Sequence, residues 1–151
     1  MKEKIIQFGH ETLRKKAIFV PEDAITTAPI KEVVANLKSS LPENGVGLAA
    51  PQIDHSLRIF LADIFKKVWR DGKLDPVICI NPEIVEVKPK QVVDWEGCLS
   101  APGLWGQVTR PDQIKVKFYD ERGELQTRWL HGVGSRVFQH ELDHLDGVLF
   151  V

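Results

Sequence analysis

Apolar residues recur at helical spacing in two stretches of the chain. The first runs from Pro29 to about Leu41, and the turn at residues 42–45 ends it. The second runs from Gly132 to Asp146. One side of its helical wheel holds Val133, Val137, His140, Glu141 and His144. The remaining arc, which is expected to face solvent, holds Ser135, Arg136, Gln139, Asp143 and Asp146.

Shorter apolar runs predict β-strands between the two helices. Leu57 to Ala62 and Pro76 to Ile80 have the length and composition of buried strands. The pair Asn81-Pro82 is expected to end the second strand, because proline cannot donate a hydrogen bond to a neighbouring strand. Residues 84–87 are expected to continue a sheet.

A β-hairpin is predicted on either side of a turn region at residues 120–123. Apolar residues alternate with their neighbours before and after this turn, at Ile114, Val116 and Phe118, and again at Leu125, Thr127 and Trp129. Each strand then has one apolar face, as in an antiparallel sheet that is covered on one side. Helices beside such a sheet make an α+β fold, and residues 1–151 suit one domain.

Charge and composition exclude several classes of protein. Lys and Arg number 20 against 21 Asp and Glu, so the chain has no basic excess for nucleic acid and no polybasic block for a membrane surface. Its longest apolar runs, such as Ile59–Ala62, are far shorter than the roughly 20 residues that span a bilayer. The N-terminus contains Glu3 and Glu11 and reads as neither a signal nor a transit peptide. A soluble intracellular protein is expected.

Residues 140–144 read His-Glu-Leu-Asp-His, which is an H-E-x-x-H motif in the second predicted helix. Histidines at positions i and i+4 lie one above the other and can bind one metal ion. Glu141 lies about 80–100° around the helix from them, so its carboxylate can reach a water molecule beside the ion. The alternative is two buried histidines beside a carboxylate, which would bury three titratable groups without a compensating ion.

A catalytic site of this kind needs a third protein ligand. After His144 the chain offers only Asp146, which points away from the histidines on the helical wheel. Cys98 is the best candidate, because a thiolate is a strong ligand and the adjacent Gly97 lets the backbone approach closely. The weaker alternatives are three isolated histidines and a cysteine that reads as a small buried apolar residue, namely His10, His55, His131 and Cys79.

One thiolate and two neutral imidazoles would leave a divalent ion with an open fourth position, and Fe(II), Zn(II), Co(II) and Ni(II) all suit such donors. Glu141 could then move a proton from water to a leaving amine during attack on an amide or ester carbonyl. The run Gly-Val-Gly-Leu-Ala-Ala-Pro-Gln at 45–52 has small residues that permit close backbone approach. It also has Gln52, whose amide can stabilise an oxyanion. Taken alone, that run could equally be a turn between helix and strand.

Three segments of the chain, in order, resemble the signature motifs of the peptide deformylase family. They are Gly-Val-Gly-Leu-Ala-Ala-Pro-Gln at 45–52, Glu-Gly-Cys-Leu-Ser at 96–100 and Gln-His-Glu-Leu-Asp-His at 139–144. Segments that flank them also fit the family, namely Leu13-Arg14, Asn81-Pro82, residues 108–111 and Arg136. The resemblance covers nearly the whole chain.

The resemblance implies antiparallel strands around a central C-terminal helix, and removal of the N-formyl group from the N-terminal formyl-methionine of nascent polypeptides, with release of formate. The implied metal ligands are Cys98, His140 and His144. The implied catalytic residues are Glu141 as general acid and base, with Gln52 and the backbone N–H of Leu99 as oxyanion donors. Residues expected to contact the peptide, which would align as an added strand, are Gly45, Val46, Gly47, Gly97, Val133 and Val137.

The resemblance also implies a cofactor, partners and a compartment. The family usually works with one ferrous ion, replaceable by Zn(II), Ni(II) or Co(II). Formyl-methionyl nascent peptides are the expected partners, in the bacterial cytoplasm or an organelle. Docking to the ribosome is left open, because many family members continue beyond the position where this chain ends, at Val151.

Two positions depart from the family pattern. Asp54 stands where glycine is common, and Gly134-Ser135 stands where apolar residues are usual, which indicates a different methionine pocket. Two other functions stay open at this stage. One is a metallohydrolase for another small amide or formyl compound. The other is a structural metal site, which would need a fourth protein ligand that the sequence does not offer.

Overall fold

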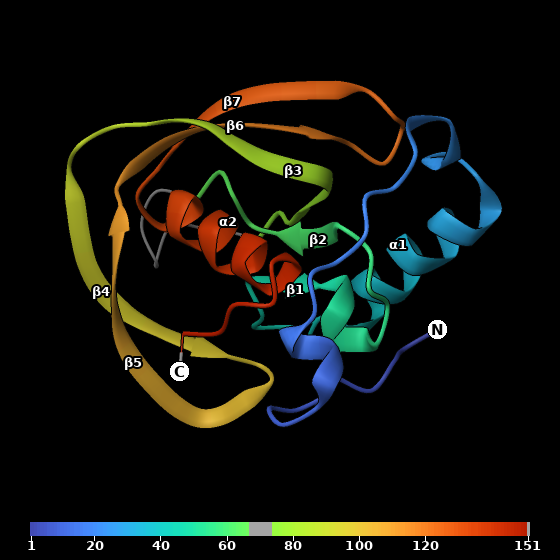
Figure 1. Ribbon diagram of the computed structural model, residues 1–151, viewed down its shortest axis with the longest axis horizontal. Helices are drawn as coiled ribbons and strands as arrows, with labels where there is room; N and C mark the ends of the chain where they lie inside the picture. The colour runs from blue at the N-terminus through green and yellow to red at the C-terminus, as the bar shows by residue number, and fades with distance from the viewer. Residues whose placement is uncertain (67–73, 151) are drawn as a thin grey trace.

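Antiparallel strands surround a C-terminal helix in the computed structural model, which describes residues 1–66 and 74–150 (Figure 1). One sheet has the order β1-β2-β3-β6-β7, with bounds Gly47–Ala49, Ile59–Ala62, Val77–Val87, Gln113–Tyr119 and Leu125–His131. A two-stranded ribbon consists of β4 (Gln91–Cys98) and β5 (Ala101–Pro111). The helices are α1 (Ala28–Ser40) and α2 (Gly132–Leu145), with short 3-10 turns η1 (Glu11–Arg14), η2 (Glu22–Ala24) and η3 (Ala50–Ile53). The predicted α+β fold is confirmed. Within the described part of the chain, no helix has both the length and the apolar character needed to cross a membrane.

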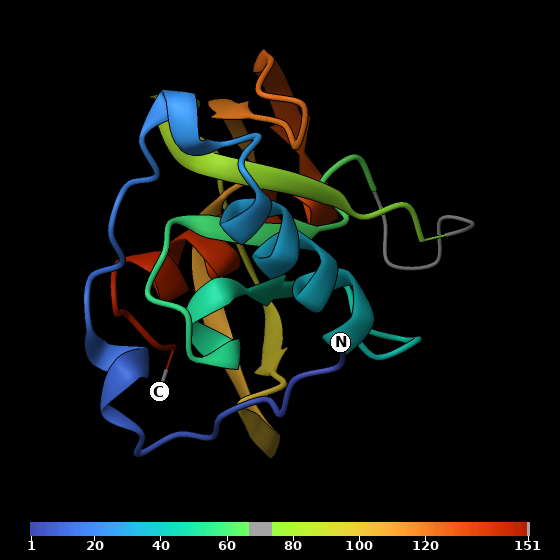
Figure 2. The same ribbon diagram turned by 90° about the vertical axis from the view of Figure 1, so that its right-hand side faces the viewer.

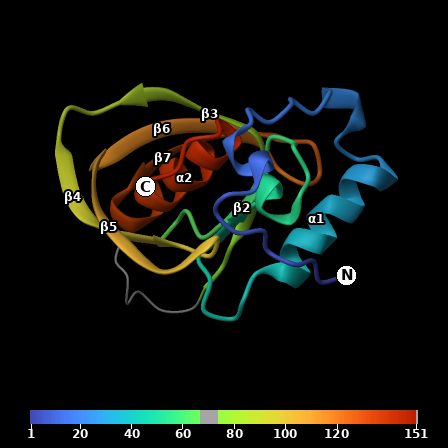
Figure 3. The same ribbon diagram turned by 60° about the horizontal axis from the view of Figure 1, so that its bottom comes forward.

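Strand β2 lies between the two helices and is buried on both faces (Figures 1 and 3). Phe60 faces α2 and packs edge-on against Phe138, with ring centroids 5.1 Å apart. The neighbouring Leu61 belongs to the cluster on the other face, together with Leu37 of α1. Burial on both faces explains why this strand reads as an uninterrupted apolar run in the sequence.

The β4–β5 ribbon covers the arc of α2 that the helical wheel assigns to solvent (Figure 3). Ser135, Arg136 and Gln139 are only 0%, 6% and 6% exposed, so the prediction that they face solvent is wrong. Asp143 is half-buried, and Asp146 alone of the five is exposed. The physical reason is that these polar groups bond to the ribbon; Gln139, for example, donates a hydrogen bond to the Pro111 carbonyl at 3.0 Å.

Strand β3 runs through Asn81-Pro82, so the prediction that this pair ends the strand is wrong. The ladder to β6 shifts register between Ile80 and Glu83, and a bulge there spares Pro82 from donating a hydrogen bond. Asn81 adopts a left-handed φ of 52°. Its side chain accepts a hydrogen bond from the Val20 N–H at 2.9 Å and donates one to the Val20 carbonyl at 2.7 Å, which holds the bulge in place.

The β6–β7 hairpin is confirmed, but β7 buries the opposite face from the predicted one. Leu125 and Trp129 are 54% and 36% exposed, whereas Leu130 is 2% exposed. The alternation along β7 alone does not determine which face is buried, because both faces carry a leucine. The pairing with β6 determines the buried face, since Leu130 lies opposite the buried Ile114.

Asp54 follows η3 with a φ of 63°, in the left-handed region. Glycine adopts that conformation without steric cost, which explains why it is common at this position, and aspartate is among the residues that tolerate it. Here the side chain gains a contact as well, because Asp54 Oδ1 accepts a hydrogen bond from Thr12 Oγ1 at 3.0 Å. This departure from the family pattern therefore preserves the turn.

The N-terminal segment runs along one edge of the molecule and passes beside the C-terminal segment (Figure 2). The Ile6 N–H donates to the Gln52 carbonyl at 2.8 Å, and the Phe8 N–H donates to the Ser100 carbonyl at 2.9 Å. Phe8 also packs edge-on against Phe150, with ring centroids 6.4 Å apart. The segment thus ties together the two loops that follow β1 and β4.

Gly134 lies where the first turn of α2 meets the segment after β2. Its N–H donates to the Lys66 carbonyl at 2.6 Å, and a Cβ at this position would overlap the Ile64 carbonyl oxygen. Because backbone lies on the other side of the contact, no rotamer change can make room. This packing is the physical reason for glycine where the family usually has an apolar residue.

Gly134→Ala is therefore expected to lower the free energy of unfolding by about 2–4 kcal/mol. Alanine is the better helix former by about 1 kcal/mol, so helix propensity alone predicts a change of the opposite sign. Chemical denaturation of the variant beside the wild type measures the difference. A variant as stable as the wild type would show that the segment after β2 does not press on the helix.

Candidate functional site

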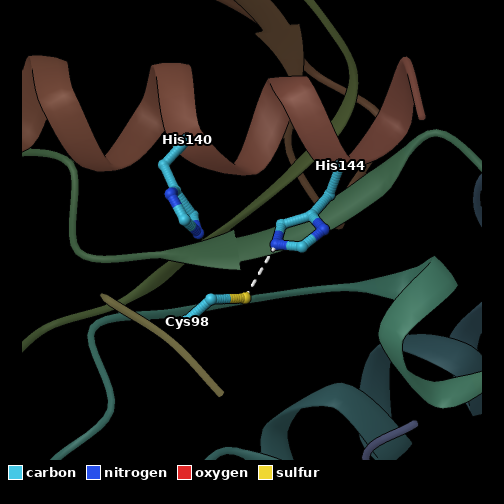
Figure 4. A group of neighbouring side chains, drawn as sticks. All are labelled: Cys98, His140 and His144. Carbon is cyan, nitrogen blue, oxygen red and sulfur yellow. Dashed lines mark hydrogen bonds between the residues drawn. The ribbon is translucent and has the colours of Figure 1, made fainter. Parts of the chain in front are cut away.

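Two histidines of α2 and the cysteine that ends β4 meet in space (Figure 4). Cys98 Sγ lies 3.3 Å from His144 Nε2. One ligand atom from each of Cys98, His140 and His144 lies within 4.8 Å of the other two. The i, i+4 spacing puts both imidazoles on one side of α2, with ring centroids 5.1 Å apart. The structure thus brings together the three residues that the sequence analysis selects as metal ligands.

This donor set fits a divalent transition-metal ion. Thiolate and imidazole are ligands that Zn(II) and Fe(II) accept. His140 Nδ1 lies 2.9 Å from Glu96 Oε1, and since the carboxylate can only accept, the ring donates from Nδ1 and keeps Nε2 available for an ion. The group comprises three donors among the described residues, which leaves a fourth position for water or substrate, as in catalytic sites.

The two histidines differ in their protonation. Burial lowers the pKa of His144 to about 3, aided by the charges of His140 and Arg110, so this imidazole is neutral. Burial also acts against the charged form of His140, but hydrogen bonds with Cys98 and Glu96 and the charge of Glu141 outweigh it and raise the pKa to about 10. A cation bound by both rings would displace the proton from His140.

Glu141 is buried at the same site, with 3% of its surface exposed. Among the residues that the structure describes, none hydrogen-bonds to its Oε1. Burial raises the pKa of Glu141 to about 7, although the charge of His140 acts in the opposite direction. A Cβ at Gly47 would lie only 2.6 Å from Oε2, so glycine there leaves room for the carboxylate. A carboxyl group with a pKa near neutrality is suited to general acid and base catalysis.

Gln52 is fixed with its amide NH2 toward Cys98. Its Oε1 accepts a hydrogen bond from the Ala49 N–H at 2.9 Å, which sets the orientation of the amide. Nε2 then donates to Ser100 Oγ at 3.0 Å and lies 3.7 Å from Cys98 Sγ. Leu99 lies between Cys98 and Ser100, in the turn that joins β4 to β5. The structure therefore places the Gln52 amide beside the thiol, while the role of the Leu99 N–H stays a prediction.

A cavity of about 760 Å³ opens onto this group. Ten of the predicted site residues line it, namely Gly45, Val46, Gly47, Gln52, Gly97, Cys98, Leu99, Val137, His140 and Glu141. Val133 is not among the residues that line the cavity, so its assignment to the substrate pocket is corrected here. It lies in the first turn of α2, which the segment ending at Lys66 covers.

Glu96 joins three cationic or hydrogen-bonding groups behind the metal ligands. It accepts hydrogen bonds from Arg110 Nη2 at 2.8 Å, Arg136 Nη1 at 2.7 Å and His140 Nδ1 at 2.9 Å. Burial alone would raise the pKa of Glu96, but hydrogen bonds from Arg110 and His140 and their charges lower it to about 2. This carboxylate is therefore ionised and fixes the ring of one metal ligand.

The sequence patterns indicate no individual role for Glu96 or Arg110, and the helical wheel predicts that Arg136 faces solvent. Two local signals could have indicated them. Glu96 is two residues before Cys98, and Arg136 lies one helical turn before His140. The pairing of Glu96 with the two arginines depends on the β4–β5 ribbon lying against α2, and no local sequence pattern predicts that contact.

Glu96→Gln is expected to lower the free energy of unfolding by about 3 kcal/mol, because it takes the counter-charge from the buried Arg136 and leaves the buried Arg110 only its pair with the half-buried Asp143. It should also weaken Ni(II) binding at least about tenfold, since His140 loses an ionised partner. Denaturation curves and a metal titration measure both effects.

Glu83→Gln is the matched control. Glu83 pairs with Lys117 at 2.9 Å, and both side chains are about half exposed, so this substitution should lower stability far less than Glu96→Gln. Equal effects of the two substitutions would contradict the role given to Glu96.

An H-E-x-x-H helix, a thiol and a buried carboxylate around one cavity are the features of an α+β hydrolase that acts on a carbonyl compound. The sequence model of the family described as polypeptide deformylase matches residues 2–151. The chain belongs to this family and is a deformylase.

Named relatives and solved structures agree with this membership. Peptide deformylase 2 of Nostoc sp. is 41% identical over 150 residues, which cover 97% of this chain and 83% of the relative. The peptide deformylase of Desulfitobacterium hafniense is 42% identical, with 98% and 91% covered. A Met-Ala-Ser-bound class I type b peptide deformylase from Acinetobacter baumannii superposes with a TM-score of 0.90 at 31% identity, covering 99% of this chain and 96% of that one. The peptide deformylase of Thermotoga maritima gives a TM-score of 0.80 at 41% identity, covering 99% and 95%.

Proposed function

We propose that this protein is a metal-dependent hydrolase that removes the N-formyl group from the N-terminal formyl-methionine of nascent polypeptides and releases formate. The observation that carries the proposal is the convergence of Cys98, His140 and His144, two of which, Cys98 and His140, line one cavity together with the buried Glu141. The Met-Ala-Ser in the Acinetobacter baumannii structure has the form of a deformylated product. The compartment we propose is one where synthesis begins with formyl-methionine, the bacterial cytoplasm or an organelle.

Cys98, His140 and His144 would hold one divalent ion, for which we propose Fe(II), with Zn(II), Ni(II) or Co(II) as substitutes that suit the same donors. When bound, the ion would polarise the formyl carbonyl and lower the pKa of a water molecule. Glu96 keeps His140 in the orientation that presents Nε2 to the ion.

The substrate would lie as an extended strand between β1 and β4. Strand β1 is an outer strand of its sheet, and β4 pairs only with β5 among the described residues, so each has an edge that can bond to a peptide. Gly47 and Gly97 lie on these strands and line the cavity, and the space that a side chain would fill is taken by Glu141 at Gly47 and by Trp105 at Gly97. Val46 and Val137 supply apolar surface for the methionine side chain.

Glu141 would move the proton that hydrolysis requires. Its Oε1 accepts a proton from the attacking water as the oxygen bonds to the formyl carbon. Gln52 Nε2 and the Leu99 N–H donate hydrogen bonds to the oxyanion that forms. The carbon–nitrogen bond then breaks, Glu141 returns the proton to the leaving amine, and formate departs. One water molecule is consumed, and no other reactant is needed.

The test is formate release from formyl-Met-Ala-Ser by protein loaded with Ni(II), with acetyl-Met-Ala-Ser as the control. We expect formate from the first peptide and no hydrolysis of the second. Protein that holds one metal ion and releases no formate would overturn the proposed function.

A further inference from the structure

Trp105 of β5 lies over the segment of β4 that leads to Cys98, one of the three proposed metal ligands. The β4–β5 register pairs Trp105 with Gly97, the residue before Cys98. A Cβ at Gly97 would come within 2.7 Å of the Trp105 ring, so the indole covers this glycine. Trp105 nevertheless stays 65% exposed and lines the cavity. The site therefore presents a large aromatic surface that the protein itself leaves uncovered.

Alternation along β4 determines which substrate side chain can reach that surface. Glu96 points toward α2, where it bonds to His140 and Arg136, so Gly97 faces the opposite way, as does its cross-strand neighbour Trp105. Side chains of a peptide added beside β4 alternate in the same manner. With the methionine side chain on the α2 side, near Val137, the second side chain of the peptide points toward Trp105.

We propose that Trp105 is a specificity residue that contacts the side chain of the second residue of a formyl-methionyl peptide and favours large apolar or aromatic residues there. The inference rests on the proposed function, because it takes such a peptide as the substrate. A planar indole offers a broad apolar surface, so the gain grows with the area that the second side chain covers. Phenylalanine at this position gains contact that alanine is too short to make.

The experiment compares kcat/KM for formyl-Met-Phe-Ser and formyl-Met-Ala-Ser in the Ni(II)-loaded enzyme. The wild type should prefer the phenylalanine peptide about tenfold. Trp105→Ala should reduce this ratio to about one, mainly through KM, whereas Trp105→Phe should retain part of the preference. The matched control is Trp129→Ala, which removes a part-exposed tryptophan of β7 and should leave the ratio unchanged.

Binding of product peptides gives a second measurement that requires no variant. Calorimetric titration of the wild type should show Met-Phe-Ser binding about tenfold tighter than Met-Ala-Ser. Equal rates and equal affinities for the two peptides would overturn this inference alone, as would a preference that survives Trp105→Ala. An equal loss on both peptides would also overturn it, because Trp105 would then act only by supporting Gly97. Formate from neither peptide would overturn the proposed function as well.

Discussion

Glu141→Gln should reduce kcat/KM for formyl-Met-Ala-Ser by at least about a thousandfold while leaving the metal content unchanged. Glutamine keeps the shape of the side chain but cannot accept the proton of the attacking water. The native carboxyl is well placed for that task, because burial raises its pKa to about 7 and its Oε1 has no hydrogen-bond partner among the described residues. Formate assays and elemental analysis of the same preparation measure activity and bound metal.

Asp143→Asn is the control for removing a negative charge from the same helix. Asp143 is half-buried and pairs with Arg110 at 2.9 Å, away from the cavity lining. Its loss should reduce activity less than about tenfold, since only the support of Glu96 through Arg110 changes. Near-normal turnover by Glu141→Gln would remove Glu141 from the role of general base. Loss of metal along with activity would instead give its carboxylate a structural role.

The parts of the fold that could be predicted are the helices and strands whose burial is visible in their own pattern of apolar residues. Both helices bury an apolar side, so their helical spacing is visible in the sequence, although α2 also buries the polar side that the ribbon covers. Strand β2 is buried on both faces and appears as an apolar run. The β4–β5 ribbon was not predicted, because Val93, Trp95 and Trp105 are exposed while polar residues face α2. The inward side of this ribbon carries charge, so hydrophobic alternation gives no indication of a strand.

The same distinction applies to the candidate site. Both histidines and Glu141 lie within one helical turn, so local spacing was sufficient to select them. Cys98 could be selected because the metal site needs a third ligand and because this thiol directly follows a glycine. Glu96, Arg110 and Arg136 form their network across three elements, and a helical wheel assigns an arginine to water unless a counter-charge is known. The support for the ligands therefore had to come from the structure.

Cys98→Ala is expected to weaken Ni(II) binding by at least about a hundredfold and to abolish formate release. It removes the anionic donor and leaves two imidazoles, which hold a divalent ion much less tightly. Cys79→Ala is the matched control, because this thiol is fully buried in β3 and packs in the apolar core. That control should lose only about 1 kcal/mol of stability and keep one ion per chain.

The comparison of these two variants separates ligation from packing. If Cys98 is a ligand, its removal should change the metal titration far more than the denaturation curve, because the side chain ends β4 beside the cavity and not in the core. If Cys98 serves packing instead, its removal should change the denaturation curve more than the metal titration. An unchanged stoichiometry and affinity in Cys98→Ala would require another third donor. Among the described residues no other group of three lies close enough to supply one, so that result would also contradict the proposed metal site.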